Sequence, residues 1–373
     1  MNSQFPSYNA LPPVPDMPQG CAWAVFNKGA KKDVYGCLNK ITSDVIVHAA
    51  SEVKDGVSIS LKLVNALGAC AAPNLRFHSW PMGAVKRPAM LRKGLVHKVT
   101  SFLDTPLGVH GFDDEVRMRM MAVTARRSPR QIEFNTQSSS QWDSLCHFHY
   151  QGQRCGYNGV RPSADDLVQN FGDEDKEQKF PTINHWHSKG CLVTRGVLID
   201  YKMYAERHKM EYSPFESRVI TVGDIEAIAR EQRVSFRQGD VIIIRTGFTA
   251  ALGGATDEEQ QEMLGTQRSV GVAQSPETVE WFWNKHFAAV AADNAGFEVL
   301  PPLVNGQNVG TTQDMLLHQT FLGLFGLPIG ELWDLEALSQ YCTLHGRYTF
   351  LLTSSPLNVA GAVASPPNAI AIF

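Results

Sequence analysis

Several features that define common classes of protein are missing from this sequence of 373 residues. No uninterrupted apolar run approaches the roughly 20 residues that cross a bilayer, so no membrane helix is expected. The seven cysteines include no CxxC pair, and their odd number and wide scatter favour reduced thiols in a cytoplasmic protein over a disulfide framework. The first 20 residues have neither the basic start nor the apolar centre of a signal peptide.

An excess of charge of either sign is also missing. Lysine and arginine number 34 and aspartate and glutamate 37, which gives a net charge of −3. Because the chain has no long basic run, nucleic acid is not expected to be a partner. The expected partner is a small-molecule substrate. A GxSxG elbow, a Walker A loop and a dinucleotide fingerprint are all absent, which disfavours a nucleophilic serine and a nucleotide cofactor.

The composition that is present belongs to a folded protein. Hydrophobic residues make up 43% and charged residues 19% of the chain, which is typical of a globular protein. By length the chain could form two domains or one large α/β domain. Prolines gather at the start, so residues 1–33 are expected to form an arm, either disordered or wrapped over a neighbouring subunit.

Local patterns predict both helices and strands. Residues 43–52 follow capping residues and show helical spacing, whereas residues 57–63 alternate between apolar and polar side chains like a half-buried strand. In the stretch 189–200, Arg195-Gly196 introduces an apolar run ended by Asp200, which predicts a buried strand, and the β-branched run in 241–247 predicts a strand covered on both faces. The proline-containing residues 66–92 are interpreted as an irregular loop, either at a substrate entrance or without function.

Capping residues predict the N-termini of two helices. Thr221 with Asp224 resembles a capping box, and Ser275 before Pro276 follows the rule that places proline at the first helical position. A short strand is expected over 288–292. This alternation of strands and helices supports the α/β class.

Residues 135–147 hold the strongest candidate site, with the sequence NTQSSSQWDSLCH. Side chains of a strand alternate, so Gln137, Gln141, Asp143 and His147 fall on one side of an extended segment. Three oxygen ligands and one imidazole would suit a divalent ion such as Mn²⁺ or Zn²⁺. A solvated loop with a hydrogen-bonded surface pair of Asp143 and His147 is the alternative.

The same residues resemble the signature of the metal-dependent cyclase/hydrolase family, which includes bacterial kynurenine formamidase and isatin hydrolase. The usual form is HxGTHxDxPxH, and QxxxQWDxxxH resembles the variant of trans-dienelactone hydrolase-like members. Gln137 and Gln141 replace two histidines, which favours one ion over two. The resemblance implies a swivelling β/β/α fold for residues 34–373 and a homodimer or homotetramer.

Two residues near the C-terminus enter through this resemblance. His318 on an apolar helix is by default a core histidine, and Glu331 is by default a surface acid. The resemblance implies that both complete the metal shell. Trp142 and Arg245 are the candidate substrate contacts, although a structural salt bridge is the alternative for Arg245.

The function that these expectations imply is a metal-dependent hydrolase. Metal-bound hydroxide would open a lactone, a cyclic amide or a similar activated carbonyl compound, with His147 or Glu331 moving the proton. A cyclase or dehydratase of a biosynthetic pathway is one alternative. A binding protein without catalysis, left after the two histidines became glutamines, is another.

Overall fold

A computed structural model describes ten stretches of the chain, which together hold every candidate site residue. They are residues 5–29, 31–61, 98–101, 112–115, 136–137, 139–162, 164–167, 179–304, 308–358 and 361–373. The expected loop over 66–92 and the end of the expected strand over 57–63 lie outside these residues.

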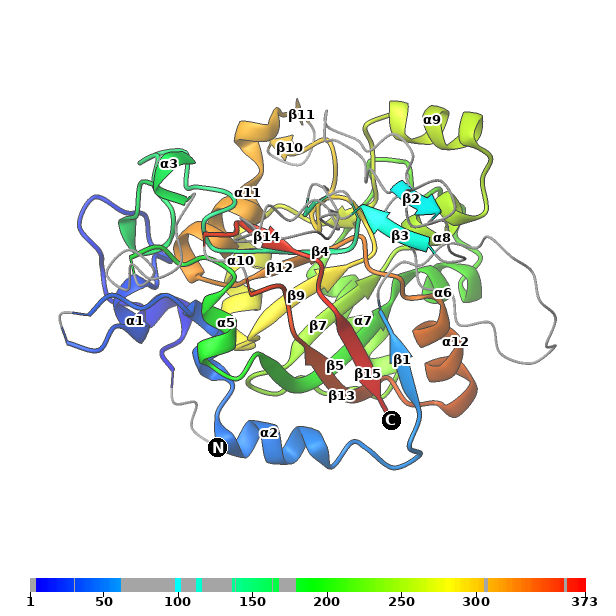
Figure 1. The fold of residues 1–373 in the computed structure, drawn as a ribbon, viewed down its shortest axis with the longest axis horizontal. Coiled ribbons are helices and arrows are strands. Elements are labelled where there is room, and N and C mark those ends of the chain that lie inside the picture. Colours follow the sequence, from blue (N-terminus) through cyan, green and yellow to red (C-terminus); the bar gives the residue numbers. More distant parts are fainter. Residues whose placement is uncertain are drawn as a thin grey trace.

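A nine-stranded mixed sheet forms the centre of the molecule, in the order β1-β15-β13-β5-β7-β9-β12-β4-β14 (Figure 1). In chain order, the bounds are β1 Ser58–Ser60, β4 Gln141–Asp143, β5 Leu192–Asp200, β7 Val241–Arg245, β9 Ala289–Ala292, β12 Ile329–Glu331, β13 Thr349–Ser354, β14 Ala364–Ser365 and β15 Ala369–Ile372. Three pairs lie apart from this sheet: β2 Lys98–Ser101 with β3 Phe112–Glu115, β6 Val219–Ile220 with β8 Gly271–Val272, and β10 Leu303–Val304 with β11 Asn308–Val309.

Helices surround the sheet. The α-helices are α1 Trp23–Phe26, α2 Ser43–Ala50, α3 Ala164–Leu167, α5 His185–Ser188, α6 Tyr201–Arg207, α7 Val222–Glu231, α8 Phe248–Gly253, α9 Asp257–Gly265, α10 Pro276–Asn284, α11 Leu316–His318 and α12 Glu336–His345. Short 3-10 helices span Tyr8–Ala10, Gly36–Lys40, Tyr157–Gly159 and Thr312–Asp314, and α11 continues into a π-helix, Gln319–Phe325.

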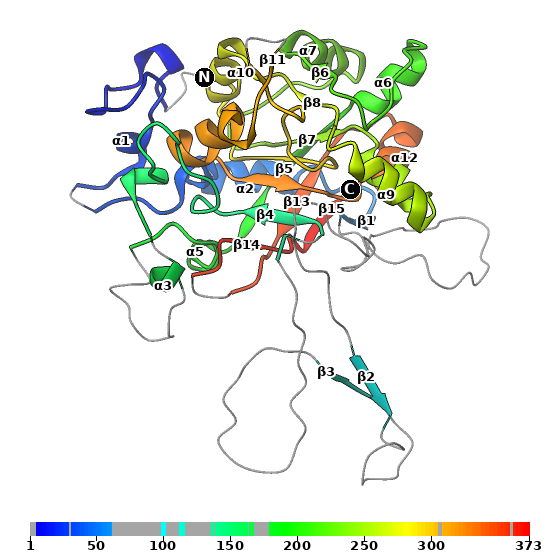
Figure 2. The ribbon, with the colours of Figure 1, turned by 90° about the horizontal axis from the view of Figure 1, so that it is seen from above.

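The central strands separate two hydrophobic cores. Along β7, Ile242 and Ile244 face one core, and Val241 and Ile243 face the other. Helices α7 and α10 cover the first core and α5 and α12 the second, and α7 and α10 lie on the opposite side of the sheet from α5 in Figure 2. Burial on both faces explains why the strand is a continuous run of apolar residues.

The expected helices after Thr42, Thr221 and Ser275 and the expected strands over 189–200, 241–247 and 288–292 are confirmed. Helix α2 begins after Thr42, whose hydroxyl accepts a hydrogen bond from the backbone of Val45. Helix α7 has the capping box of Thr221 and Asp224, and α10 has Ser275 as its cap with proline in the first turn. The α/β class is therefore correct.

The N-terminal segment packs on its own chain. The indole of Trp283 donates to the carbonyl of Pro6, and the Tyr8 ring contacts Phe325 edge-on. Ala22 and Trp23 also reach the end of the π-helix: Trp23 Nε1 donates to the Gly323 carbonyl at 2.8 Å, and the backbone N–H of Ala22 donates to the Leu324 carbonyl at 3.0 Å. A helix leaves its last carbonyls without partners, so this segment acts as the cap of the π-helix.

Two further expectations concern the cysteines and membrane-spanning helices. The cysteines that the structure describes are free thiols, and Cys70 lies outside the described stretches. Within those stretches, every helix is too short or too polar to span a bilayer.

Candidate metal centre

Strands β4 and β12 bring together two parts of the candidate site that lie far apart in the sequence. They pair antiparallel, with Gln141 opposite Glu331 and Asp143 opposite Ile329. The expectation of one extended segment through residues 137–147 is wrong, because the strand covers only Gln141–Asp143 and His147 follows through a turn. Alternation still places the side chains of Gln141 and Asp143 on one face of β4.

His318 approaches this face from the end of α11. Its Nε2 lies 3.2 Å from Oε1 of Glu331, and its Nδ1 lies 2.8 Å from Oε1 of Glu298. Glu298 also accepts hydrogen bonds from the backbone N–H groups of Leu317 and His318. This carboxylate therefore fixes both the helix start and the imidazole, as carboxylates commonly do behind a metal-binding histidine.

Asp143, His318 and Glu331 form a buried group whose ligand atoms lie within 4.8 Å of one another. Two amides hold the outer carboxylate oxygens: Gln141 Nε2 donates to Glu331 Oε2 at 2.5 Å, and Gln137 Nε2 donates to Asp143 Oδ1 at 2.6 Å. Two other oxygens at the centre, Gln141 Oε1 and Asp143 Oδ2, have no hydrogen-bond donor among the described residues, and Glu331 Oε1 lies 3.2 Å from His318 Nε2. Buried polar atoms normally have partners, so these oxygens fit a hard cation.

The charges of the group also favour a bound cation. The carboxylates of Asp143, Glu298 and Glu331 are buried, and no lysine or arginine in the described part of the chain pairs with them. Burial lowers the pKa of His318, but hydrogen bonds to Glu298 and Glu331 outweigh it and raise the pKa to about 10. Burial raises the pKa of Asp143. A divalent cation would balance this negative charge, which is costly to bury alone.

His147 lies at the edge of the group. Its Nε2 is 4.0 Å from Asp143 Oδ1, and its side chain keeps 19% of its surface exposed, whereas Asp143 is fully buried. The amide nitrogen of Gln137 contacts both ring nitrogens at 3.0 and 3.1 Å. His147 therefore lies between the buried group and solvent, outside the set of atoms that meet within 4.8 Å.

The structure does not bring Trp142 and Arg245 to this site. The Trp142 side chain is 0% exposed on the opposite face of β4, where it contacts Trp186 and Trp333. Arg245 is buried and pairs with Asp200 and Glu336. The expected substrate contacts are thus replaced by a core tryptophan and by the structural salt bridge that was the alternative for Arg245.

Sequence reasoning missed Glu298 and its partner Gln274, whose amide donates to Glu298 Oε2 at 2.8 Å. Glu298 follows strand β9 by six residues, in the polar stretch that begins with Asp293 and Asn294. The carboxyl ends of β9 and its parallel neighbour β12 lie at one edge of the sheet, so polar residues after β9 were the available signal.

Comparison with known proteins identifies the family. A family model described as "Putative cyclase" matches residues 58–299, more than half of the chain. The match includes Gln141 and Asp143 and ends before His318 and Glu331. No curated protein matches the chain.

Several solved structures are similar to this chain. A protein described as a novel cyclase is 26% identical, with a TM-score of 0.66 over 91% of this chain and 96% of that chain. An isatin hydrolase bound to the product analogue thioisatinate is 12% identical, with a TM-score of 0.49 over 89% of this chain and 99% of that chain. Isatin hydrolase A from Labrenzia aggregata, bound to benzyl benzoate, is also 12% identical, with a TM-score of 0.45 over 87% and 94%. The cyclase-like fold expected from the sequence is confirmed.

Proposed function

Because the chain belongs to the Cyclase family, we propose that it is a metal-dependent hydrolase that opens a lactone, a cyclic amide or a similar activated carbonyl compound. The observation that carries the proposal is a buried, negatively charged group in which Asp143, Glu331 and the His318 imidazole meet and in which Gln141 Oε1 and Asp143 Oδ2 have no donor among the described residues. Such a donor set suits one divalent ion, Zn²⁺ or Mn²⁺.

Asp143, His318 and Glu331 would hold the ion, with Gln141 Oε1 as a further oxygen. When bound, a divalent ion polarises a carbonyl group and lowers the pKa of water toward about 7. Gln137 and Gln141 keep the two carboxylates turned so that one oxygen of each stays available. Glu331 is held from both sides, by Gln141 and by His318, which suits a ligand better than a mobile base.

His147 is the candidate for moving protons. Its half-open position lets it accept a proton from the attacking water while the oxygen of that water bonds to the carbonyl carbon. The same proton can then pass to the leaving nitrogen or oxygen as its bond to carbon breaks. The Phe148 ring lies 6.4 Å from the His147 ring and 5.5 Å from the His318 ring, and it forms an apolar wall beside both.

Metal binding tests the first half of this proposal. Protein stripped with a chelator should bind one Mn²⁺ or Zn²⁺ per chain in a calorimetric titration, and Asp143→Ala should remove that binding. Two ions per chain, or unchanged binding by the variant, would contradict the assignment. Sedimentation of the same samples tests the expected homodimer or homotetramer.

Substrate turnover in ¹⁸O-labelled water tests the second half. The loaded protein is incubated with isatin, an aromatic lactone and an N-formyl amide, and the products are analysed by mass spectrometry. Hydrolysis places one labelled oxygen in the new carboxylate. A ring-closed or dehydrated product without label would instead show a cyclase or dehydratase. Binding of the ion without turnover of any substrate would favour a binding protein.

A further inference from the structure

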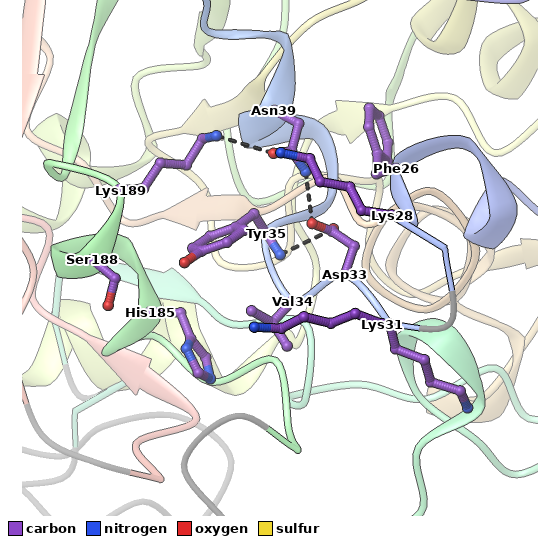
Figure 3. Close-up of a pocket in the computed structure, with 11 residues that line it drawn as sticks. Phe26, Lys28, Lys31, Asp33, Val34, Tyr35, Asn39, His185, Ser188 and Lys189 are labelled. Carbon is purple, nitrogen blue, oxygen red and sulfur yellow. Dashed lines mark hydrogen bonds between the residues drawn. The ribbon is translucent and has the colours of Figure 1, made fainter. Parts of the chain in front are cut away.

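A cavity that shares no lining residue with the metal centre lies between residues 26–39 and helix α5. It has a volume of about 470 Å³, and Figure 3 shows the side chains that line it. The walls come from residues 26–39 on one side and 185–189 on the other, and none of them is a metal-centre residue. Cavities of this size hold small organic molecules in many proteins.

Four lysines, Lys28, Lys31, Lys32 and Lys189, and a single carboxylate, that of Asp33, line this cavity. In the described part of the chain no carboxylate lies within ion-pair distance of Lys28, Lys32 or Lys189.

Asp33 is already occupied by hydrogen-bond donors. Its Oδ2 accepts from the backbone N–H groups of Tyr35 and Gly36 and from the Tyr157 hydroxyl. Its Oδ1 accepts from the Asn39 amide at 2.8 Å. Asp33 thus fixes the turn that leads into residues 36–40, and the cavity keeps an excess of positive charge.

Lys189 is the most enclosed of these cations. Burial lowers its pKa, Asp33 raises it and Lys28 lowers it further. An ammonium group has three N–H donors, and the hydrogen bond that Lys189 makes within the described residues goes to Asn39 Oδ1 at 3.0 Å. An anion in the cavity would find donors here at a half-buried position, where a charged hydrogen bond is stronger than in water.

Aromatic side chains complete the walls. Lys189 Nζ lies 5.1 Å from the centre of the Tyr35 ring, and the His185 ring meets that ring edge-on at 6.2 Å. Phe26 adds a further apolar surface. A flat body can pack beside these rings while its acidic group contacts the lysines.

We propose that this cavity binds a small organic anion, in which a carboxylate or phosphate group is attached to an aromatic body. The binding is separate from the proposed hydrolysis, because the two sites share no residue. It uses Lys28 and Lys189 as the principal cations and Tyr35 as the platform for the ring.

Calorimetric titration of the full chain in a chloride buffer tests this proposal. Phthalate carries carboxylate groups on a benzene ring, and phenyl phosphate carries a phosphate group on the same kind of ring. Benzyl alcohol is the uncharged control. Either anion should bind at about 1 mM or tighter, while benzyl alcohol should not. The anion that binds more tightly identifies the acidic group.

Variants locate the binding. Lys189→Met should weaken the anion about tenfold or more, since it removes a charged hydrogen bond, and the exposed Lys28→Met should weaken it in the same direction without a risk to folding. Lys54→Met, at an exposed position outside the cavity, is the matched control and should bind like the original protein.

Three results would overturn the proposal. The first is no binding of either anion by the original protein. The second is unchanged binding by both cavity variants when their unfolding temperatures match that of the original protein. The third is loss of anion binding in Asp143→Ala with retention in Lys189→Met, which would place the anion at the metal centre.

Discussion

Gln141 and Glu331 lie directly opposite each other on neighbouring strands, and the amide of one donates to the carboxylate of the other at 2.5 Å. The sheet therefore sets the orientation of a candidate ligand without any ion. Gln141 contributes twice, since its nitrogen holds Glu331 and its oxygen remains available at the centre.

Gln141→Leu removes both contributions at similar side-chain length. Outer hydrogen bonds of this kind typically account for about 10- to 100-fold in metal affinity, and we expect a loss in that range for Mn²⁺ or Zn²⁺. Titration calorimetry measures it. Gln151→Leu, at an exposed position outside the centre, serves as the control. An affinity within twofold of the original would show that the amide does not position Glu331.

His147→Ala separates metal binding from catalysis. Since His147 lies outside the group that meets within 4.8 Å, the variant should keep its metal content and lose about 100-fold or more in turnover. Metal analysis and a rate measurement on the same sample give both readings. Loss of the ion together with activity would instead make His147 a ligand, which was the expectation from the sequence.

Trp23→Phe tests the cap of the π-helix. The change removes the donor to the Gly323 carbonyl and keeps an aromatic ring. A buried acceptor left without a partner costs about 1–3 kcal/mol, so the free energy of unfolding should fall by that amount in urea. Trp281→Phe loses a bond to the partly exposed Glu226, which water can replace, and should cost less. Equal losses in the two variants would argue against the cap.

His286 gives the chain a defined sensitivity to acid. Burial, together with the nearby charge of Lys40, lowers its pKa from 6.5 to about 4. The unfolded chain takes up the proton first, so the stability from neutral His286 is complete above pH 6.5 and is lost as the pH falls toward about 4.

His286→Asn should reduce this loss, and asparagine tolerates the positive φ of 56° at this position. Urea unfolding at pH 7 and pH 4.5 compares the two proteins. The difference between the two pH values should be smaller in the variant. A difference of the same size would exclude His286 as the source.

The sequence predicted the centre unevenly, for physical reasons. Alternation alone placed Gln141 and Asp143 on one face, and the same rule puts the even-numbered Trp142 on the other, where the core holds it. His318 and Glu331 needed the family resemblance, because no local pattern reports a contact across 190 residues. Glu298 lies in a connecting segment, where no periodic pattern of a strand or helix indicates which way its side chain points.

The N-terminal segment shows the other limit of local patterns. Its prolines predicted an arm, and prolines do exclude regular helices and central strands. Irregular backbone can nevertheless pack tightly when its N–H groups meet open carbonyls, as they do at Leu324 and Gly326. Such pairing depends on a partner far along the chain, which hydrophobic periodicity does not reveal.

The bond from Trp23 to Gly323 joins residues 300 positions apart. During synthesis the first partner leaves the ribosome long before the second exists, and domains fold only when their segments are present. The helix that carries His318 thus receives its cap only after residue 323 has emerged. A nascent chain that displays Asp143 before His318 and Glu331 holds one of the three candidate ligands, so the proposed cation site cannot assemble until residue 331 has left the ribosome.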